Sequence, residues 1–267
     1  MKNILAGHTN SYHTYGLDES LEGIAQAGFK YVELSAVRGW TEHVPLEASA
    51  AQMAELRAKL DRLGLKASAL SGHSDLTTAE GVVNGKKAID LCQKLGLTIM
   101  NTAIGGHYSE DEDRSAFMDH IHDLADYAAA QGVTLALEVH GDIMASGQIS
   151  IPLIQEIARD NVKINYDTAN CVFYGGVQAV DDLRPVVPYL AHIHLKDTAG
   201  GKKDWNFPAV GEGHVDFARV LGILEEEGYQ GPFSVEIEFQ GGQWPPLSEV
   251  NRSMKVSYQH LKKLGLS

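Results

Sequence analysis

Leu135-Ala136-Leu137-Glu138 is a short apolar run that ends in an acid, and a similar arrangement recurs three times further along the chain. The other runs also end in an acid or a histidine: Ile164-Asn165-Tyr166-Asp167, His192-Ile193-His194 and Phe233-Ser234-Val235-Glu236. Such runs are typical of strands that are buried in a parallel sheet. Carboxylates and imidazole are ligands that bind divalent cations. If these strand ends converge, the chain is predicted to be a metalloenzyme.

Apolar runs alternate along the whole chain with segments that have helical spacing. We expect eight strands, at residues 4–7, 31–34, 65–70, 98–104, 133–139, 162–167, 190–195 and 233–239. Between them, apolar residues three and four apart, such as Met53, Leu56 and Leu60, indicate amphipathic helices. Several of these segments end in glycine, as at Gly64 and Gly96, which is a common helix stop. This alternation predicts an α/β fold, a (β/α)8 TIM barrel formed as a single domain by residues 1–267.

An open doubly wound sheet is the main alternative, and it normally carries a glycine fingerprint after its first strand. The first strand is followed instead by Gly7-His8-Thr9-Asn10-Ser11-Tyr12, which lacks that fingerprint. The longest connection, residues 198–213, is rich in glycine, lysine and aromatic residues, and we expect it to form a lid or pocket wall.

The composition is that of an ordinary globular protein, with 44% hydrophobic and 21% charged residues. The formal net charge of -13 repels a phosphate backbone and no Lys/Arg cluster offsets it, so nucleic acid is not an expected partner. The two cysteines, Cys92 and Cys171, are not expected to form a disulfide. The first apolar stretch is too short for a signal peptide, and no run of 18 apolar residues occurs. We therefore expect a cytoplasmic protein that does not bind membranes.

Active sites of TIM barrels lie at the carboxyl ends of the strands. Glu138, Asp167, His194 and Glu236 lie at or near the ends of the fifth to eighth expected strands, and neighbouring strands are only about 4.8 Å apart. Taken singly, each residue could equally be an exposed polar group. Three carboxylates buried together repel one another, however, so a cluster implies a cation or shared protons. Glu238 projects to the same face as Glu236, and the pattern alone leaves open which of the two is the last ligand.

Six motifs, in this order and spacing, resemble those of a known superfamily. They are Gly28-Phe29-Lys30-Tyr31-Val32-Glu33-Leu34, Leu135-Ala136-Leu137-Glu138-Val139-His140, Tyr166-Asp167-Thr168-Ala169-Asn170, His192-Ile193-His194-Leu195-Lys196-Asp197, Val210-Gly211-Glu212-Gly213 and Gly228-Tyr229-Gln230-Gly231-Pro232-Phe233-Ser234-Val235-Glu236. Over essentially the whole chain they resemble the sugar isomerase/epimerase superfamily with a xylose isomerase-like barrel. Its members include inosose dehydratases, hydroxypyruvate isomerases, ketose 3-epimerases and endonuclease IV.

The resemblance implies that Glu138, Asp167, His194 and Glu236 bind one divalent metal ion, expected to be Mn2+, with Mg2+, Co2+ or Zn2+ as alternatives. It favours Glu236 over Glu238, because the family's last ligand follows the strand after a Gly-Tyr-x-Gly turn. It also implies that Glu138 and Glu236 are the catalytic acid and base, which transfer a proton through a metal-stabilised enediolate. The expected function is that of a metal-dependent sugar or keto-polyol isomerase or epimerase.

Other functions remain open. A keto-sugar or keto-inositol dehydratase, which is a lyase, would use the same metal site, and a non-catalytic binding protein would retain only the barrel. Phosphodiester hydrolysis, as in endonuclease IV, conflicts with the acidic charge. Ketose 3-epimerases usually have a glutamate, a histidine and an arginine where this chain has Met144, Asn170 and Gly200. Their set of substrate-binding residues is therefore not present as a whole.

The expected partner is a small carbohydrate or polyol. The polar residues predicted to bind it lie at or after strand ends, and they are Glu33, His73, His140, Asn170 and Lys196, with His107 as a further candidate. Trp40 and Trp205 lie in loops on the same rim, where an aromatic face could cover a sugar ring. Because many relatives are oligomers, a homodimer or homotetramer is also considered, with residues 244–247 as a candidate interface.

Overall fold

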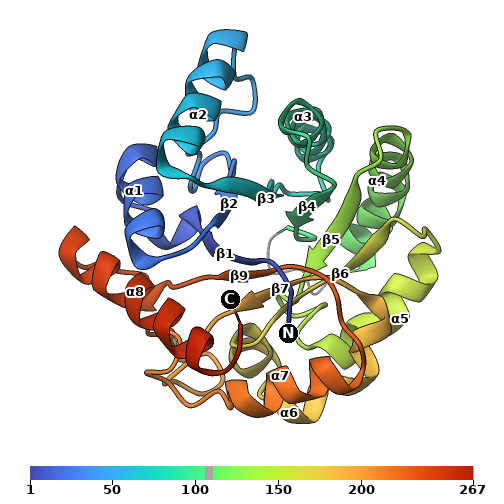
Figure 1. Ribbon diagram of the computed structural model, residues 1–267. Coiled ribbons are helices and arrows are strands. Elements are labelled where there is room, and N and C mark those ends of the chain that lie inside the picture. The colour runs from blue at the N-terminus through green and yellow to red at the C-terminus, as the bar shows by residue number, and fades with distance from the viewer. Residues whose placement is uncertain (106–110, 267) are drawn as a thin grey trace.

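The computed structural model describes residues 1–105 and 111–266. Its centre is a closed barrel of eight parallel strands, and helices surround this barrel in Figure 1. In order around the barrel, the strands are β1 (Leu5–His8), β2 (Tyr31–Ser35), β3 (Lys66–Ser71), β4 (Ile99–Thr102), β5 (Thr134–Glu138), β6 (Val162–Asp167), β7 (Leu190–Leu195) and β9 (Phe233–Val235). The predicted TIM barrel is therefore confirmed.

The helices place their apolar residues against the strands. In α2, for example, Met53, Leu56 and Leu60 are all buried, as the spacing predicts. The helix ends at Gly64, whose φ of 65° is left-handed and favours glycine. The α-helices are α1 (Leu17–Ala27), α2 (Ala50–Leu63), α3 (Ala79–Leu95), α4 (Asp111–Ala130), α5 (Gly147–Ile157), α6 (Ala179–Asp182), α7 (Phe217–Glu226) and α8 (Leu247–Lys263), and shorter turns span Thr9–Tyr12, Cys171–Gly175 and Arg184–Tyr189.

The last barrel strand is shorter than the sequence predicts. Residues 233–239 were expected to form one strand, but β9 ends at Val235. Phe239 has a positive φ of 60°, and it belongs to a separate strand, β10 (Phe239–Gln240). This strand pairs antiparallel with β8 (Asn206–Phe207) from the long connection at 198–213. The chain thus leaves the barrel after Glu236. The pairing of β10 with β8 then attaches the 198–213 connection to this end of the barrel.

The strand register brings the expected ligands to one end of the barrel. Asp167 of β6 pairs with His194 of β7, and His194 pairs with Ser234 of β9. Glu138 pairs one level lower, with Asn165 of β6. The polar side chains at the carboxyl ends of β5, β6, β7 and β9 therefore lie at different heights along the barrel axis. The tilt of the strands in a closed barrel requires such a stagger.

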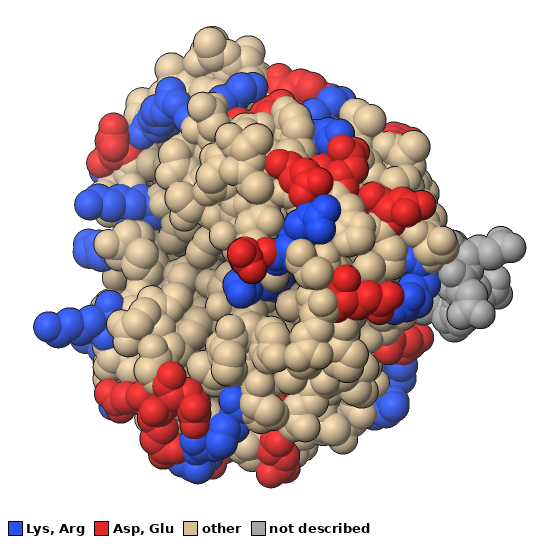
Figure 2. Space-filling model, turned by 90° about the vertical axis from the view of Figure 1, so that its right-hand side faces the viewer, with Lys and Arg blue, Asp and Glu red and all other residues tan. Residues whose placement is uncertain are grey.

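The outer surface of the helices is charged and of mixed sign. Figure 2 shows acidic and basic side chains interspersed on one side of the molecule. Ion pairs link successive helices, with Lys86 of α3 2.8 Å from Asp123 of α4 and Arg159, after α5, 2.7 Å from Asp126 of α4. Such exposed pairs contribute at most about 1 kcal/mol each. Within the described residues, no helix combines the length and the apolar character that crossing a membrane requires.

Candidate active site

A cavity of about 500 Å³ opens at the carboxyl ends of the strands. Trp205 and Phe207 of the long connection form part of its wall, where a lid or pocket wall was expected, and Trp40 lies on its rim. Its size lies within the usual range for small-molecule sites. The polar residues that line it include His8, Asn10, His73, Glu138, His140, Asn170, Tyr174, Lys196, Glu236 and Glu238.

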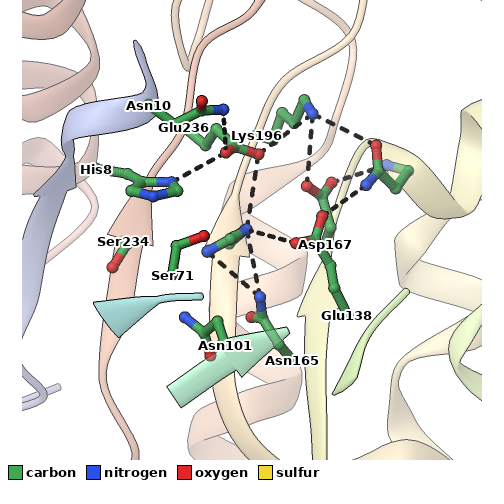
Figure 3. Close-up of polar contacts among 12 residues, drawn as sticks. His8, Asn10, Ser71, Asn101, Glu138, Asn165, Asp167, Lys196, Ser234 and Glu236 are labelled. Atoms are coloured by element: carbon green, nitrogen blue, oxygen red, sulfur yellow. Dashed lines mark hydrogen bonds and ion pairs between the residues drawn. The ribbon is translucent and has the colours of Figure 1, made fainter. Parts of the chain in front are cut away.

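Four residues that were expected to bind metal converge in this region. Glu138, Asp167, His194 and Glu236 each offer one ligand atom, and these atoms all lie within 4.8 Å of one another. All four side chains are buried. Figure 3 shows Glu138, Asp167 and Glu236 directed toward a common space beside Lys196. Three hard oxygen donors and one imidazole suit Mn2+ or Mg2+, and also accept Co2+ or Zn2+.

The surroundings of the Asp167 carboxylate fit a bound cation. Its Oδ1 accepts hydrogen bonds of 2.8 Å from the backbone N–H groups of both Ala169 and Asn170, which fixes the carboxylate. Among the described residues, nothing donates a hydrogen bond to its Oδ2, although that atom is fully buried. Burial raises the pKa of Asp167 to about 7 against the attraction of Lys196, and the carboxylates of Glu138 and Glu236 raise it as well. A bound cation would offset both the cost of burying the Asp167 charge and its repulsion by the two glutamates.

Glu138 is held by one residue on each oxygen. His73 Nε2 lies 2.9 Å from its Oε2, and Asn170 Nδ2 donates to its Oε1 over the same distance. Burial disfavours the charge of Glu138, but its contacts with His194 and His73 keep its pKa below the usual range. The side chain is therefore an oriented carboxylate.

Glu236 is held in a similar way from the other side. His8 Nδ1 lies 2.9 Å from its Oε1, and Asn10 Nδ2 donates to the same oxygen over 3.0 Å. Burial again disfavours the charge, but Lys196, His194 and His8 lower the pKa of Glu236 well below its usual range. Each glutamate thus contacts one histidine and one asparagine.

Glu238 lies outside the group of four. Its Oε2 is 2.5 Å from Lys196 Nζ, and Lys196 also donates to Glu236 Oε2 over 3.3 Å. The lysine is fully buried, which disfavours its charge, but the surrounding carboxylates raise its pKa well above the usual value. Glu238 is therefore the ion-pair partner of a buried lysine, while Glu236 joins the candidate ligands.

The residues that were expected to bind substrate divide into two sets. His73, His140, Asn170 and Lys196 line the cavity, and His140 Nε2 lies 2.9 Å from the Tyr174 hydroxyl. Glu33 is placed differently, because its side chain has no exposed surface and lies beneath His194, 3.1 Å from Nε2. That position does not allow the substrate contact that was expected of Glu33. His107 lies outside the described residues.

Residues 21–263 match the family model of the xylose isomerase-like TIM barrel. The chain belongs to this family. It is 26% identical over 240 residues to L-ribulose 3-epimerase of Methylomonas sp. (strain DH-1), a match that covers 83% of this chain and 78% of that protein. It is 27% identical over 261 residues to the L-ribulose-5-phosphate 3-epimerase UlaE of Salmonella typhi, with coverage of 90% and 88%. The xylose isomerase domain protein from Planctomyces limnophilus superposes with a TM-score of 0.79 at 22% identity, over 98% of this chain and 97% of that one.

Within this xylose isomerase-like barrel, the positions that depart from the ketose 3-epimerase pattern have distinct surroundings. Met144 is fully buried and, like Gly200, is not among the described residues that line the cavity. Asn170 does line it and donates to Glu138, so it orients a candidate catalytic group. The substrate contacts of this chain must therefore come largely from other residues.

Among the cavity residues that were not predicted from the sequence, three contact candidate site residues. His8 ends β1 and Asn10 follows it, and both reach Glu236 because β1 closes the barrel against β9. Closure of an eightfold barrel was predicted, so a histidine at the end of the first strand was a signal that could have been used. Tyr174 lies in the turn Cys171–Gly175 after β6, and no spacing rule indicated that it would reach His140.

Proposed function

We propose that this protein is a divalent-metal-dependent epimerase or isomerase of ketoses or keto-polyols. The proposal is carried by one observation, namely that Glu138, Asp167, His194 and Glu236 bring their ligand atoms within 4.8 Å of one another at the cavity. The printed names of the relatives, L-ribulose 3-epimerase and L-ribulose-5-phosphate 3-epimerase, support the same class of reaction.

The four residues would hold the metal ion, which we propose to be Mn2+, although the same ligands accept Mg2+, Co2+ or Zn2+. When bound, the cation would polarise a substrate carbonyl and the neighbouring hydroxyl, and so acidify the C–H bond between them. Asp167 and His194 would serve mainly as ligands. Asp167 would offer its Oδ2 to the ion, since its Oδ1 already accepts hydrogen bonds from the backbone.

Glu138 and Glu236 would move the proton. They come from β5 and from the end of β9, which are three strands apart in the barrel, so a substrate between them presents a different face to each. One carboxylate takes the proton from the carbon next to the carbonyl, and the other returns a proton on the opposite face, which inverts that carbon. The contacts of Glu138 with His73 and of Glu236 with His8 keep each carboxylate in its orientation. Lys196 would donate a hydrogen bond to a substrate oxygen.

We further propose that the substrate is an unphosphorylated ketose. Of the described residues that line the cavity, Arg38 and Lys196 alone carry a formal positive charge at neutral pH. Arg38 already forms ion pairs with Glu42 and Glu47, and Lys196 with Glu236 and Glu238. The segment 106–110, Gly-His-Tyr-Ser-Glu, adds no lysine or arginine. A phosphate dianion would therefore lack a free cationic partner here.

Two further properties are proposed rather than established. Cys92 and Cys171 are both buried and free, which supports a reducing compartment such as the cytoplasm. We propose a homodimer or homotetramer, and light scattering would test this oligomeric state. Trp244, in the segment suggested as an interface, contacts the chain itself, because its Nε1 donates to the Ser11 carbonyl over 2.8 Å.

The test is a product assay on metal-stripped protein that has been reconstituted with Mn2+. A panel of free ketopentoses and ketohexoses, together with their terminal phosphates, would be separated by chromatography after incubation. We expect an epimer or an aldose from at least one free ketose, and loss of that product in Glu138→Gln and Glu236→Gln. Glu55→Gln, on the exposed face of α2, is the matched control and should keep full activity.

Full activity in chelated Glu236→Gln protein would contradict the proposal. Loss of water from a keto-sugar or keto-inositol, without epimerisation, would instead identify a dehydratase that uses the same residues. Binding of sugars without any product would favour a non-catalytic binding protein. If the protein converts phosphorylated ketoses but no free ketose, the proposed reaction stands and only the proposed substrate is contradicted.

A further inference from the structure

A carboxylate that lines no part of the cavity lies directly beneath the candidate metal ligands. Glu33 belongs to β2, three strands from β7 around the closed barrel, and its side chain is fully buried. Its Oε2 lies 3.1 Å from His194 Nε2, and its Oε1 lies 3.3 Å from the same nitrogen. Both oxygens of Glu33 are therefore close to one ring nitrogen of the only histidine among the four candidate ligands.

The other ring nitrogen of His194 faces the candidate ligands. Its Nδ1 lies 3.6 Å from Glu138 Oε2 and 3.6 Å from Glu236 Oε2. Asn165 Nδ2 is 3.3 Å from both ring nitrogens, so it does not distinguish between them. Glu33 does distinguish between them, because an ionised carboxylate accepts a hydrogen bond and cannot donate one. The proton that it accepts must be on Nε2.

The position of Glu33 is fixed by residues from several strands. Asn101 of β4 donates to its Oε1 over 2.6 Å. His8 Nε2 lies 3.8 Å from its Oε1, and His192 Nε2 lies 3.7 Å from its Oε2. In Figure 3, Asn101 and Asn165 lie on one side of the cluster, and Glu236, Lys196 and Asn10 lie on the other. Glu33 is thus surrounded by polar side chains from β1, β4 and β7.

We propose that Glu33 is a positioning residue for the metal site. By holding the proton on His194 Nε2, it leaves the lone pair of Nδ1 directed toward Glu138 and Glu236, where the cation would bind. It also fixes the plane of the ring and makes Nδ1 a better electron donor. This inference rests on the proposed metal-dependent function and assigns a role to a residue that touches neither the cation nor the substrate.

The first experiment measures Mn2+ binding to metal-stripped protein by calorimetry. Partners of this kind typically change metal affinity by about 10- to 100-fold, and we expect a loss of that size in Glu33→Gln. Asp182→Asn is the control, because Asp182 is also a buried carboxylate but accepts its hydrogen bonds from Gly147, Gln148 and Tyr166. The control should retain the wild-type affinity even if it lowers stability. An unchanged Mn2+ affinity in folded Glu33→Gln would overturn the proposal.

The second experiment needs no variant, so it decides the matter even if Glu33→Gln fails to fold. Wild-type protein with ¹⁵N-labelled histidine rings, loaded with diamagnetic Zn2+, should show one metal-bound ring with the ion on Nδ1 and a proton on Nε2. An ion on Nε2 with the proton on Nδ1 would refute the role of Glu33. Wild-type protein that binds neither Mn2+ nor Zn2+ would contradict the proposed function itself, which separates the two failures.

Discussion

Replacing Asp167 with asparagine should stabilise the metal-free protein while abolishing tight metal binding. Asp167 Oδ2 is buried without a hydrogen-bond donor among the described residues, and it lies among other carboxylates. Asparagine keeps an oxygen for the backbone N–H groups of Ala169 and Asn170 and removes the charge. Its amide would also bring N–H donors to the neighbouring Glu138 and Glu236. Stability is expected to increase because, without a cation, the wild-type protein buries the Asp167 charge among other carboxylates.

The magnitude follows from the pKa of Asp167, which rises from 3.8 to about 7 in the folded protein. At about 1.4 kcal/mol per pKa unit, this shift sets a ceiling of about 4 kcal/mol on the cost of the charge. Because the folded pKa is the higher one, the cost is fully present above pH 7. It falls as the pH decreases and disappears below the unfolded pKa. The advantage of asparagine should therefore be largest at pH 8 and less than half as large at pH 5.

The assay is urea unfolding of wild-type and Asp167→Asn protein in EDTA at both pH values. We expect a higher midpoint for the variant at pH 8, without a change in the slope of the transition. Asp182→Asn is again the matched control, and it should be less stable than wild type because it loses hydrogen bonds that a carboxylate accepts from several donors. If Asp167→Asn is no more stable than wild type at pH 8, the reasoning is refuted.

Three further predictions concern the metal and the buried charges. The apparent Kd for Mn2+, measured by calorimetry, should weaken about tenfold per unit as the pH falls below about 7, because Asp167 must lose its proton; an affinity that does not vary with pH would contradict this. Glu138→Gln and Glu236→Gln should each lower kcat by about 10² to 10⁴ in steady-state assays; wild-type kcat in either would exclude it as acid or base. Lys196→Met should destabilise the metal-free protein by about 3 to 5 kcal/mol in urea. The control Lys203→Met, at an exposed ion pair with Asp142, should lower the free energy of unfolding by less than about 1 kcal/mol. Equal losses in the two variants would show that burial of Lys196 is not decisive.

The barrel was predictable because its signals are local. Each strand is a short apolar run, and glycines such as Gly64 and Gly96 end helices where a helix stop was expected. The convergence of Asp167 and His194 followed from the position of each residue at the end of its strand. The end of the last strand was not predictable in this way. Its length depends on the pairing of β8 with β10, a contact between distant segments.

The positions of Glu33 and His8 show the same limit within the site. His8 ends β1, whereas Glu33 lies two residues before the end of β2. Sequence spacing does not distinguish a residue that faces the cavity from one that lies a level below it. Glu33 is buried under His194 because the barrel is staggered, and its partner lies 161 residues away. His8 reaches Glu236 only after the first and last barrel strands have paired. These contacts depend on the register between strands of the closed barrel, which no local pattern encodes.

The central claim is that this site exchanges a proton at a carbon next to a carbonyl, and that it needs a divalent cation to do so. The most direct measurement is proton NMR of a responsive free ketose in D2O, with wild-type protein in Mn2+ or in EDTA. The proposal predicts loss of the signal from the hydrogen next to the carbonyl, as deuterium replaces it, in Mn2+ but not in EDTA. Equal exchange in EDTA, or no exchange with any ketose in Mn2+, would contradict it.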